Sequence, residues 1–379
     1  MKFSINGIIS FYMLICLALM GFNILYIARS KHTSRARSSR QQQWTTTIAA
    51  ECACIQNGSP PADRYSEQLV HKLRHIENLM AYHEAVLSVR EQDPDAVQQY
   101  LDAYSPVFYQ LAVLYRDRPA MERAFLAHVI AVCHPACGHL TGRLIETLLT
   151  YFEDSTVFCR ENILHALFAL GDGSAVKRAF HLMNRHGWFH DSRLLADGLA
   201  AFNGDRTELA WQLWEECHQW SESFQVAVVR FAGLLSDSFC AEFLAALQRE
   251  STRTEVRFAL VRYFQRRPYP AAYPYLLHLL ARDQQETGGL AIAAASALVS
   301  YPGQETHDAL FEALHSRNWY VRKNAAASLT ALGDCQEDLV LLRQQGDRYA
   351  AEMLEYMIEA AQARHPQTGE TPQILEVGA

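Results

Sequence analysis

The sequence predicts an all-α protein in which an α-solenoid of stacked helical hairpins follows one N-terminal transmembrane helix. Three observations predict this fold. Leu and Ala are abundant, whereas Val-rich alternating runs and Asn-Gly or Asp-Gly hairpin signals are scarce. Residues 7–28 form a long apolar stretch without a charged side chain. From residue 159 onward, a short pattern of residues recurs every 31–34 positions.

The composition is that of a folded protein with an uneven distribution of charge. Of the 379 residues, 50% are hydrophobic and 20% are charged, and the formal net charge is -7. Residues 1–40 contain six basic side chains and no acidic one, so the remainder carries 28 basic and 41 acidic side chains. An acidic body is a poor electrostatic match for phosphate backbones, and we therefore expect no nucleic-acid partner.

The apolar stretch of residues 7–28 is long enough to cross a bilayer. Its 22 residues hold no charge, and at about 1.5 Å per residue a helix of this length spans a hydrocarbon core of roughly 30 Å. The apolar core of a signal peptide is shorter, about 7–15 residues, and ends at a small-residue cleavage site, which is not evident here. We therefore expect an uncleaved transmembrane helix, and the alternative is a signal peptide.

The flanking charges predict the orientation of this helix. Five basic residues lie within the twelve positions after it, and only Lys2 and the amino terminus lie before it. The positive-inside rule then places the C-terminal body in the cytoplasm, on a single-pass protein of the cell inner membrane. The nine cysteines do not space like a disulfide framework, which fits reduced thiols. An extracytoplasmic body is the alternative.

Shifts in composition divide the chain into segments. Residues 41–65 are polar and contain the breakers Gly58, Pro60 and Pro61, which predicts a linker with room for one short helix. The predicted segments are a short N-terminal tail at 1–6, the transmembrane helix at 7–28, a basic juxtamembrane segment and linker at 29–65, degenerate helical repeats at 66–119, clear repeats at 120–363 and a disordered C-terminal tail at 364–379.

Internal repetition predicts the architecture of the body. Residues 159–172 (CRENILHALFALGD) and 321–334 (VRKNAAASLTALGD) share Arg, Asn, Leu, Ala and Gly-Asp in register, 162 positions apart. We expect Gly-Asp pairs at 171–172, 204–205 and 333–334 to end helices. One such hairpin cannot bury its apolar face alone, so neighbouring units must stack. Equivalent positions fall near Arg160, Arg193, Val226, Arg257, Ala291 and Arg322.

The clearest unit predicts helices at 305–316 and 319–332. Gly333 is expected to supply a left-handed C-cap after the second helix. Pro274 opens another predicted helix, because its missing N–H costs little at that position. The apolar face of the helix at 319–332 is predicted from i, i+4, i+8 spacing to contain Val321, Ala325, Ala326, Leu329 and Leu332.

This pattern resembles the HEAT-repeat family, in which a Leu-rich helix and a short turn with Asp precede a helix with Val-Arg-x-x-Ala-x-x-Ala-Leu. Residues 309–333 match well, with Val321, Arg322, Ala325 and Leu329 in place, although Asn318 replaces the usual Asp. The resemblance extends over residues 120–363. It implies a right-handed superhelix and a scaffold for proteins, here of a bacterial, single-pass, membrane-anchored kind, and it transfers no catalytic residue.

Two sets of side chains are candidates for a special role. Arg160, Arg257 and Arg322 recur at one place in the repeat, and we expect them to bond to the turn acid or to an adjacent repeat rather than to a ligand. Trp211 and Trp214 share a helix face at i, i+3 spacing, and Trp220 follows closely. These three tryptophans either pack in the core or form a protein-binding hot spot.

We expect no catalytic residue, no cofactor and no metal. The segment CHPACGH (133–139) holds zinc-type ligands, but its C-x3-C spacing has no second Cys pair elsewhere. His181, His186 and His190 surround a helix-breaking Gly187 and do not form an H-E-x-x-H motif. A Gly-rich phosphate loop and a G-x-S-x-G motif are also missing from the sequence.

The sequence therefore predicts a scaffold or adaptor that binds proteins at the cytoplasmic face of the membrane and is not an enzyme. The partner could be a membrane enzyme, and tethering would raise its effective concentration, so that a weak interface suffices. No small-molecule substrate is evident. The alternatives are a HEAT-like enzyme of the alkylpurine DNA glycosylase or bilin lyase type, and an extracytoplasmic binding module. The acidic body disfavours the glycosylase, which needs a basic groove.

Overall fold

The predicted fold class is confirmed at the level of secondary structure. The computed structural model describes residues 5–282, 288–333 and 335–364, and of residues 5–12, 24–34, 288 and 364 it describes the backbone alone. Within these ranges every regular element is a helix, and no strand occurs. Except for residue 364, the predicted disordered tail at 364–379 lies outside the described residues.

The chain divides into two compact units, one of residues 1–179 with 201–204 and one of residues 180–200 with 205–379. In the first unit, α6 packs between α3 and α8, and α2 and α7 pair with the helices that follow them. The degenerate stretch 66–119 is helical, as predicted. The helices of this unit are α1 (Ile5–Gln56), α2 (Asp63–Leu73), α3 (Ile76–Arg90), α4 (Pro94–Ala103), α5 (Ser105–Tyr115), α6 (Ala120–Cys133), α7 (Thr141–Thr150) and α8 (Val157–Leu170).

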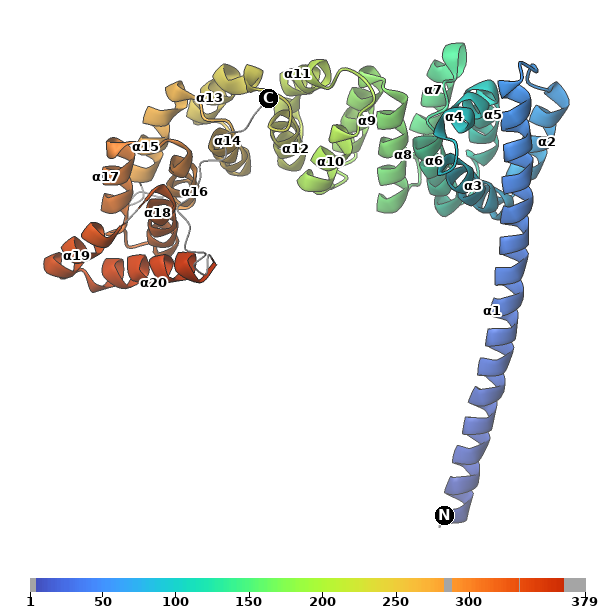
Figure 1. The fold of residues 1–379 in the computed structure, drawn as a ribbon, viewed down its shortest axis with the longest axis horizontal. Helices are drawn as coiled ribbons and strands as arrows, with labels where there is room; N and C mark the ends of the chain where they lie inside the picture. Colours follow the sequence, from blue (N-terminus) through green and yellow to red (C-terminus); the bar gives the residue numbers. More distant parts are fainter. Residues whose placement is uncertain (1–4, 283–287, 334, 365–379) are drawn as a thin grey trace. The chain divides into compact units, whose positions relative to one another are not determined.

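The second unit alternates two sets of helices (Figure 1). From α10 to α20, each even-numbered helix packs on the next even-numbered helix. Each of α11, α13, α15, α17 and α19 also packs on the helix that directly follows it in the chain. Helix α9 (Gly173–Arg185) begins in the first unit and ends in the second. The other helices are α10 (Ser192–Ala200), α11 (Arg206–Glu216), α12 (Glu222–Ala232), α13 (Cys240–Gln248), α14 (Thr254–Arg266), α15 (Tyr273–Ala281), α16 (Gly288–Ala297), α17 (Gln304–Ala313), α18 (Trp319–Leu332), α19 (Gln336–Gln345) and α20 (Arg348–Arg364).

The structure overturns the predicted linker as far as Gln56, whereas the breakers Gly58, Pro60 and Pro61 do lie between helices, before α2 begins at Asp63. Helix α1 runs without a break to Gln56, and Figure 1 shows it as one long helix that joins the first unit. Its last part packs on α3 and α4. Trp44, Ile48 and Cys52 are at most 7% exposed, and their spacing of four residues places them on one helix face. Because many of the residues between them are polar, the sequence did not show an apolar helix face here.

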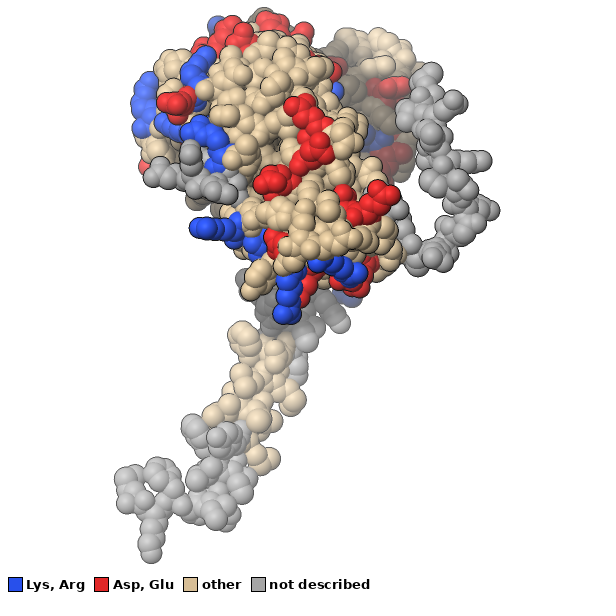
Figure 2. Space-filling model, turned by 90° about the vertical axis from the view of Figure 1, so that its left-hand side faces the viewer, with Lys and Arg blue, Asp and Glu red and all other residues tan. Residues whose placement is uncertain are grey.

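The N-terminal part of α1 leaves the body as a single helix. The side chains from Met13 to Phe22 carry no charge, and both of these end residues are more than 60% exposed. In the space-filling view the corresponding narrow projection is tan (Figure 2). The predicted transmembrane stretch 7–28 lies partly outside the residues whose side chains are described. Among the described residues, no helix has the length and apolar character needed to span a membrane.

The best-predicted hairpin is α17–α18. Helix α18 has the predicted bounds, whereas α17 starts one residue earlier than predicted and ends three residues sooner. Val321, Ala325, Ala326 and Leu329 are buried as predicted, because they follow the i, i+4, i+8 face. Leu332 is only half-buried, since it lies in the last turn. Pro274 lies in the first turn of α15, also as predicted.

Two of the three helix ends predicted at Gly-Asp pairs are confirmed, because Gly171 and Gly333 directly follow α8 and α18, whereas α10 ends at Ala200, before Gly204. Gly333 follows α18 in an extended conformation, with φ of 165°, and is therefore not a left-handed cap. Gly171 does adopt the left-handed conformation, with φ of 71°, after α8. Asp172 and Asp205 also begin the next helices: Asp172 accepts a hydrogen bond from the backbone N–H of Ala175, and Asp205 caps α11 in the same way.

Gly171 is expected to tolerate no side chain. A Cβ at this position would lie 2.4 Å from the backbone oxygen of Asn203, and left-handed φ adds its own strain. We expect Gly171→Ala to lower the free energy of unfolding by about 2–4 kcal/mol, measured by denaturant titration followed by circular dichroism. Gly58→Ala is the control, because Gly58 has φ of 81° but open space around it, and its cost should stay near 1 kcal/mol. An equal loss of unfolding free energy in the two variants would contradict the close approach of the Asn203 backbone to Gly171.

Asp347 stabilises the last hairpin from the start of α20. Its carboxylate accepts a hydrogen bond from the backbone N–H of Ala350 at 3.0 Å and lies 2.7 Å from Nδ1 of His315. The N–H bond and then the histidine hold the pKa of Asp347 below its usual value. A depressed folded-state pKa stabilises the protein above the unfolded pKa of about 3.9, and this contribution is lost as the pH falls through the folded value.

Asp347→Asn is therefore expected to lower the free energy of unfolding by about 1 kcal/mol at pH 7. The difference from the wild type should shrink as the pH falls below about 4, because the wild-type carboxyl group then also becomes neutral. Thermal unfolding between pH 3 and pH 8 measures this effect. Glu359→Gln, on the exposed side of α20, is the control and should change little at any pH. A constant difference across the pH range would contradict a role for the charge.

Candidate functional site

The repeat arginines form structural contacts within the hairpins. Arg160 is 7% exposed and donates to the backbone oxygen of Ser155 at 2.8 Å, in the turn before its own helix. Arg322 donates to the backbone oxygen of Ser316 at 2.6 Å in the same way. Both guanidinium groups thus hold the turn of their own hairpin. The guanidinium of Arg322 also lies 5.9 Å from the ring centroid of Tyr349 on α20, which is the predicted contact with an adjacent repeat.

Arg257 differs from these two arginines. It donates to the hydroxyl of Tyr275 at 3.2 Å, on helix α15 of the next hairpin. The sequence analysis missed a further buried arginine, Arg123, which donates to the backbone oxygens of Glu153 and Asp154 at 3.0 and 3.1 Å. Arg123 precedes Arg160 by 37 residues, outside the register of 31–34 that identified the others.

Trp220 is part of the core and is not available to a partner. It is 1% exposed, and its ring meets Phe180 and Phe224 edge-on. Its Nε1 donates to Nδ1 of His181 at 3.2 Å, and because an indole can only donate, this bond assigns the imidazole proton to Nε2. That nitrogen lies 2.7 Å from Glu216. Trp220 therefore follows the core-packing alternative, because Phe180, Phe224 and His181 surround its ring.

Trp211 and Trp214 remain half-buried on α11 and line a cleft. Trp211 stacks on Phe239 with ring centroids 4.3 Å apart, and Trp214 meets Phe243 at 4.6 Å. The cleft has a volume of about 560 Å³. We call it the tryptophan cleft, and the residues that define it are Trp211, Trp214, Glu215, Glu242, Arg249 and Arg253.

The tryptophan cleft combines aromatic and charged surface. Arg253 is held in place, because its guanidinium donates to the backbone oxygen of Trp220 at 3.0 Å. Arg249 and Glu242 are exposed at the rim. Half-buried tryptophans beside arginine are the composition of binding hot spots, since they offer large rigid apolar area and a fork of donors. The cleft is suited to an apolar or aromatic side chain with a charged neighbour.

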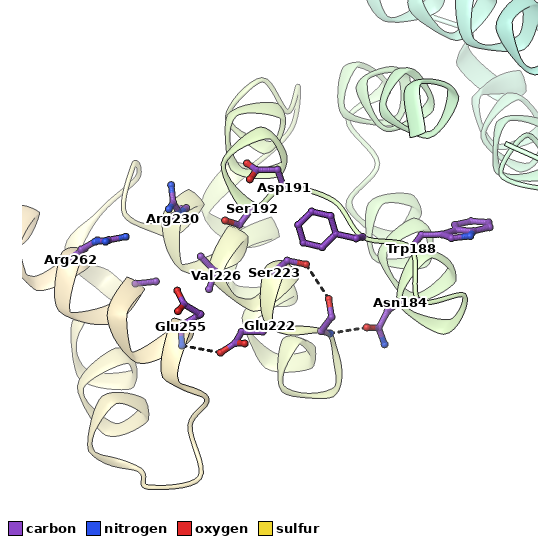
Figure 3. Close-up of a pocket in the computed structure, with 14 residues that line it drawn as sticks. Asn184, Trp188, Asp191, Ser192, Glu222, Ser223, Val226, Arg230, Glu255 and Arg262 are labelled. Carbon is purple, nitrogen blue, oxygen red and sulfur yellow. Dashed lines mark hydrogen bonds between the residues drawn. The ribbon is translucent and has the colours of Figure 1, made fainter. Parts of the chain in front are cut away.

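A second hollow extends from the starts of α10, α12 and α14 along one side of α12 and α14 (Figure 3). Its volume is about 460 Å³, and the sequence analysis did not identify it. We call it the arginine groove, after Arg230 on α12 and Arg262 on α14. The exposed Phe189 and the backbone of the α9–α10 turn form one wall.

Hydrogen bonds fix the walls of the arginine groove. The backbone N–H of Ser221 donates to the side-chain oxygen of Asn184 at 2.7 Å, which ties the start of α12 to the end of α9. The N–H of Glu255 donates to Glu222 at 2.8 Å, which ties the start of α14 to that of α12 (Figure 3). The carboxylate of Asp191 caps α10. The groove is thus built from backbone segments that hold one another in position.

The cysteine and histidine residues considered as metal ligands are dispersed. Cys133 and Cys137 are buried, and burial raises the pKa of their thiols to about 12 and about 11, which disfavours the thiolate that binds metal. His186 stacks on Trp188 with ring centroids 4.5 Å apart, whereas His181 belongs to the Trp220 contact. Over the residues described, no three or more His, Cys, Asp or Glu side chains are placed to hold a metal ion.

The helical body thus has two hollows, and hydrogen bonds to the hairpin turns hold several of their polar side chains in place. Comparison with known proteins adds no family to this description: no protein-family model matches the sequence, and no curated protein is significantly similar to it.

Proposed function

We propose that this protein is a membrane-anchored, HEAT-like α-solenoid that binds a partner protein at the cytoplasmic face of the membrane. The tryptophan cleft carries the proposal. Trp211 and Trp214 present half-buried rings next to Arg249, and this combination of residues dominates the energy of protein interfaces. The succession of paired helices in the second unit supports stacking of repeats, which generates extended surfaces for partners.

The exposed apolar part of α1 supports the membrane anchor. Leu14, Leu19 and Met20 are more than half exposed and lie on different sides of the helix. A helix that is apolar all round is stable only when protein or lipid surrounds it. The uncharged stretch extends in the sequence from residue 7 to residue 28, and basic residues follow it, which favours a cytoplasmic body.

The partner is sought by crosslinking the full-length protein in its native membranes. We expect one specific protein to be recovered, and Arg249→Glu should reduce its recovery at least tenfold. Arg249 lies at the exposed rim of the cleft, so its replacement leaves the stacked rings in place. Arg143→Glu, an equal charge change on the exposed side of α7 in the first unit, is the control. Equal recovery with both variants would exclude the tryptophan cleft, and recovery of no protein would overturn the scaffold.

The orientation is tested by labelling cysteines on intact cells with a reagent that does not cross membranes. Cys54 is exposed, whereas Cys52 is buried and the pKa of its thiol is raised to about 11 by burial. Labelling of Cys54 should therefore require permeabilised cells, and Cys54→Ser should remove it. Rapid labelling of Cys54 on intact cells would place the body outside the cytoplasm and overturn the proposed orientation.

A further inference from the structure

The arginine groove carries the same charge pattern on two neighbouring helices. Glu222 lies in the first turn of α12, and Arg230 follows eight residues later. Glu255 lies in the first turn of α14, and Arg262 follows seven residues later. At about 1.5 Å per residue, the acidic end and the basic end of the groove are therefore roughly 10–12 Å apart. Figure 3 shows the two arginines together, away from the two glutamates.

An apolar strip separates the two charged ends. Val226 lies four residues from both Glu222 and Arg230, and Ala259 lies at the matching place on α14. The spacing puts the acidic, apolar and basic residues of each helix on one face. Val226 and Ala259 are 8% and 7% exposed, so they form the floor. The exposed ring of Phe189, which is 72% accessible, stands at the wall.

The arginines are free to bind a ligand. In the part of the chain that the structure describes, neither Arg230 nor Arg262 forms an ion pair or a hydrogen bond through its guanidinium group. The side chain of Glu255 is likewise unbonded there, while Glu222 uses one oxygen for the N–H of Glu255. Two arginine forks at one end match a carboxylate, and the glutamates at the other end match a basic side chain.

We propose that the arginine groove binds an extended segment of a partner protein that carries an acidic and a basic side chain four residues apart, with an apolar side chain midway between them. Successive side chains of an extended chain point to opposite faces, so residues i, i+2 and i+4 face the groove together. They span about 13 Å at about 3.3 Å per residue, close to the separation of the charged ends. The acidic side chain pairs with Arg230 and Arg262, and the apolar one rests on Val226 and Ala259. This inference rests on the proposed scaffold function and names the chemistry of the bound segment.

The glutamates make a polyanion a poor ligand for this groove. A nucleic-acid backbone or a run of phosphates would place negative charge against Glu222 and Glu255 at the same time as it met the arginines. Like charges at such short range oppose binding. A segment with one acidic and one basic side chain can pair with the arginines and with the glutamates at the same time. This pairing accounts for the presence of one glutamate and one arginine on each of the two helices.

An array of immobilised hexapeptides tests the proposal. Each peptide holds one Glu, one Leu and one Lys in a Gly-Ser background. The Lys is placed one to five positions before or after the Glu. The array is probed with the full-length protein in detergent micelles. We expect a separation of four positions, in one order, to bind at least tenfold better than separations of three and five, which turn one of the two charges away from the groove. Binding that ignores the separation would overturn the proposal.

Matched variants assign the two ends. Arg230→Glu with Arg262→Glu should abolish the preference for the peptide Glu, and Glu255→Gln should weaken only the preference for Lys. Arg143→Glu is the charge control, and unchanged thermal unfolding confirms that each variant is folded. Unchanged peptide selection in the double variant would overturn the proposal. A crosslinked partner whose recovery is unaffected by the groove variants would overturn this inference and leave the scaffold intact. Peptide selection without any crosslinked partner would overturn the scaffold alone.

Discussion

Replacing Trp220 by Ala is expected to lower the free energy of unfolding by about 3–5 kcal/mol, the usual cost of truncating a fully buried aromatic side chain. The indole is 1% exposed and packs edge-on against Phe180 and Phe224, so its removal leaves a cavity between α9 and α12. It also removes the only hydrogen bond described for Nδ1 of His181. The backbone oxygen of residue 220 still accepts from Gln225 and Arg253, so the effect belongs to the side chain.

Denaturant unfolding followed by far-ultraviolet circular dichroism measures this loss without relying on tryptophan fluorescence. Trp220→Phe separates its two parts, because it keeps most of the apolar volume but leaves Nδ1 of His181 without a donor, at a cost of about 1–3 kcal/mol. Trp319→Ala is the control, because Trp319 is 47% exposed and should cost less than about 1 kcal/mol. A loss below 1 kcal/mol at Trp220 would show that this part of the core is loosely packed.

Replacing Leu17 and Met20 by Arg is expected to move the protein from the membrane fraction to the soluble fraction. Each arginine near the centre of a membrane helix costs about 2.5–3.5 kcal/mol, so two shift the insertion equilibrium by roughly four orders of magnitude. Both side chains are exposed on α1, and neither packs on the body, so the fold of the two units should be unchanged. Alkaline carbonate extraction of cell membranes measures the distribution.

Val340→Arg is the matched control for the membrane prediction. Val340 is 53% exposed on α19, and it should accept the same kind of charge without changing the distribution of the protein. Extraction of the wild-type protein by carbonate would contradict the anchor. Retention of the double variant in the membrane would show that another surface of the protein binds the membrane.

The sequence predicted those parts of the fold that depend on local periodicity. The bounds of α18 and its buried residues Val321, Ala325 and Leu329 followed from one regular apolar face. The second half of α1 was predicted as a linker, because its buried face consists of Trp44, Ile48 and Cys52 among polar residues. That face is recognisable only when α3 and α4 are present to cover it.

The candidate sites, too, were predictable only where they depend on local spacing. The spacing of Trp211 and Trp214 predicted a shared face, but nothing in the local sequence distinguished them from Trp220, whose burial depends on Phe180 and His181 about forty residues earlier. The arginine groove was missed because three hairpins form it.

A signal for the arginine groove was nevertheless present in the sequence. Glu222 and Glu255 are 33 residues apart, and Arg230 and Arg262 are 32 apart, which are the offsets of the repeat. Applying the repeat period to exposed charges, and not only to the conserved-looking core pattern, would have placed these four side chains on adjacent helices.

Because α1 is one unbroken helix, the distance of the first unit from the membrane and its rotation about the axis of α1 change together. Arg37, which forms an ion pair with Glu84, follows residue 28 by nine positions. With residues 7–28 in a bilayer, this pair lies about 14 Å from the end of the apolar stretch. A helix in this position behaves as a screw: each residue added to it lifts the first unit by about 1.5 Å and turns it by about 100°. Seven added residues would raise the first unit by about 10 Å and leave its orientation about the helix axis almost unchanged. Two added residues would rotate it by about 200°, so that nearly its opposite side would face the same direction.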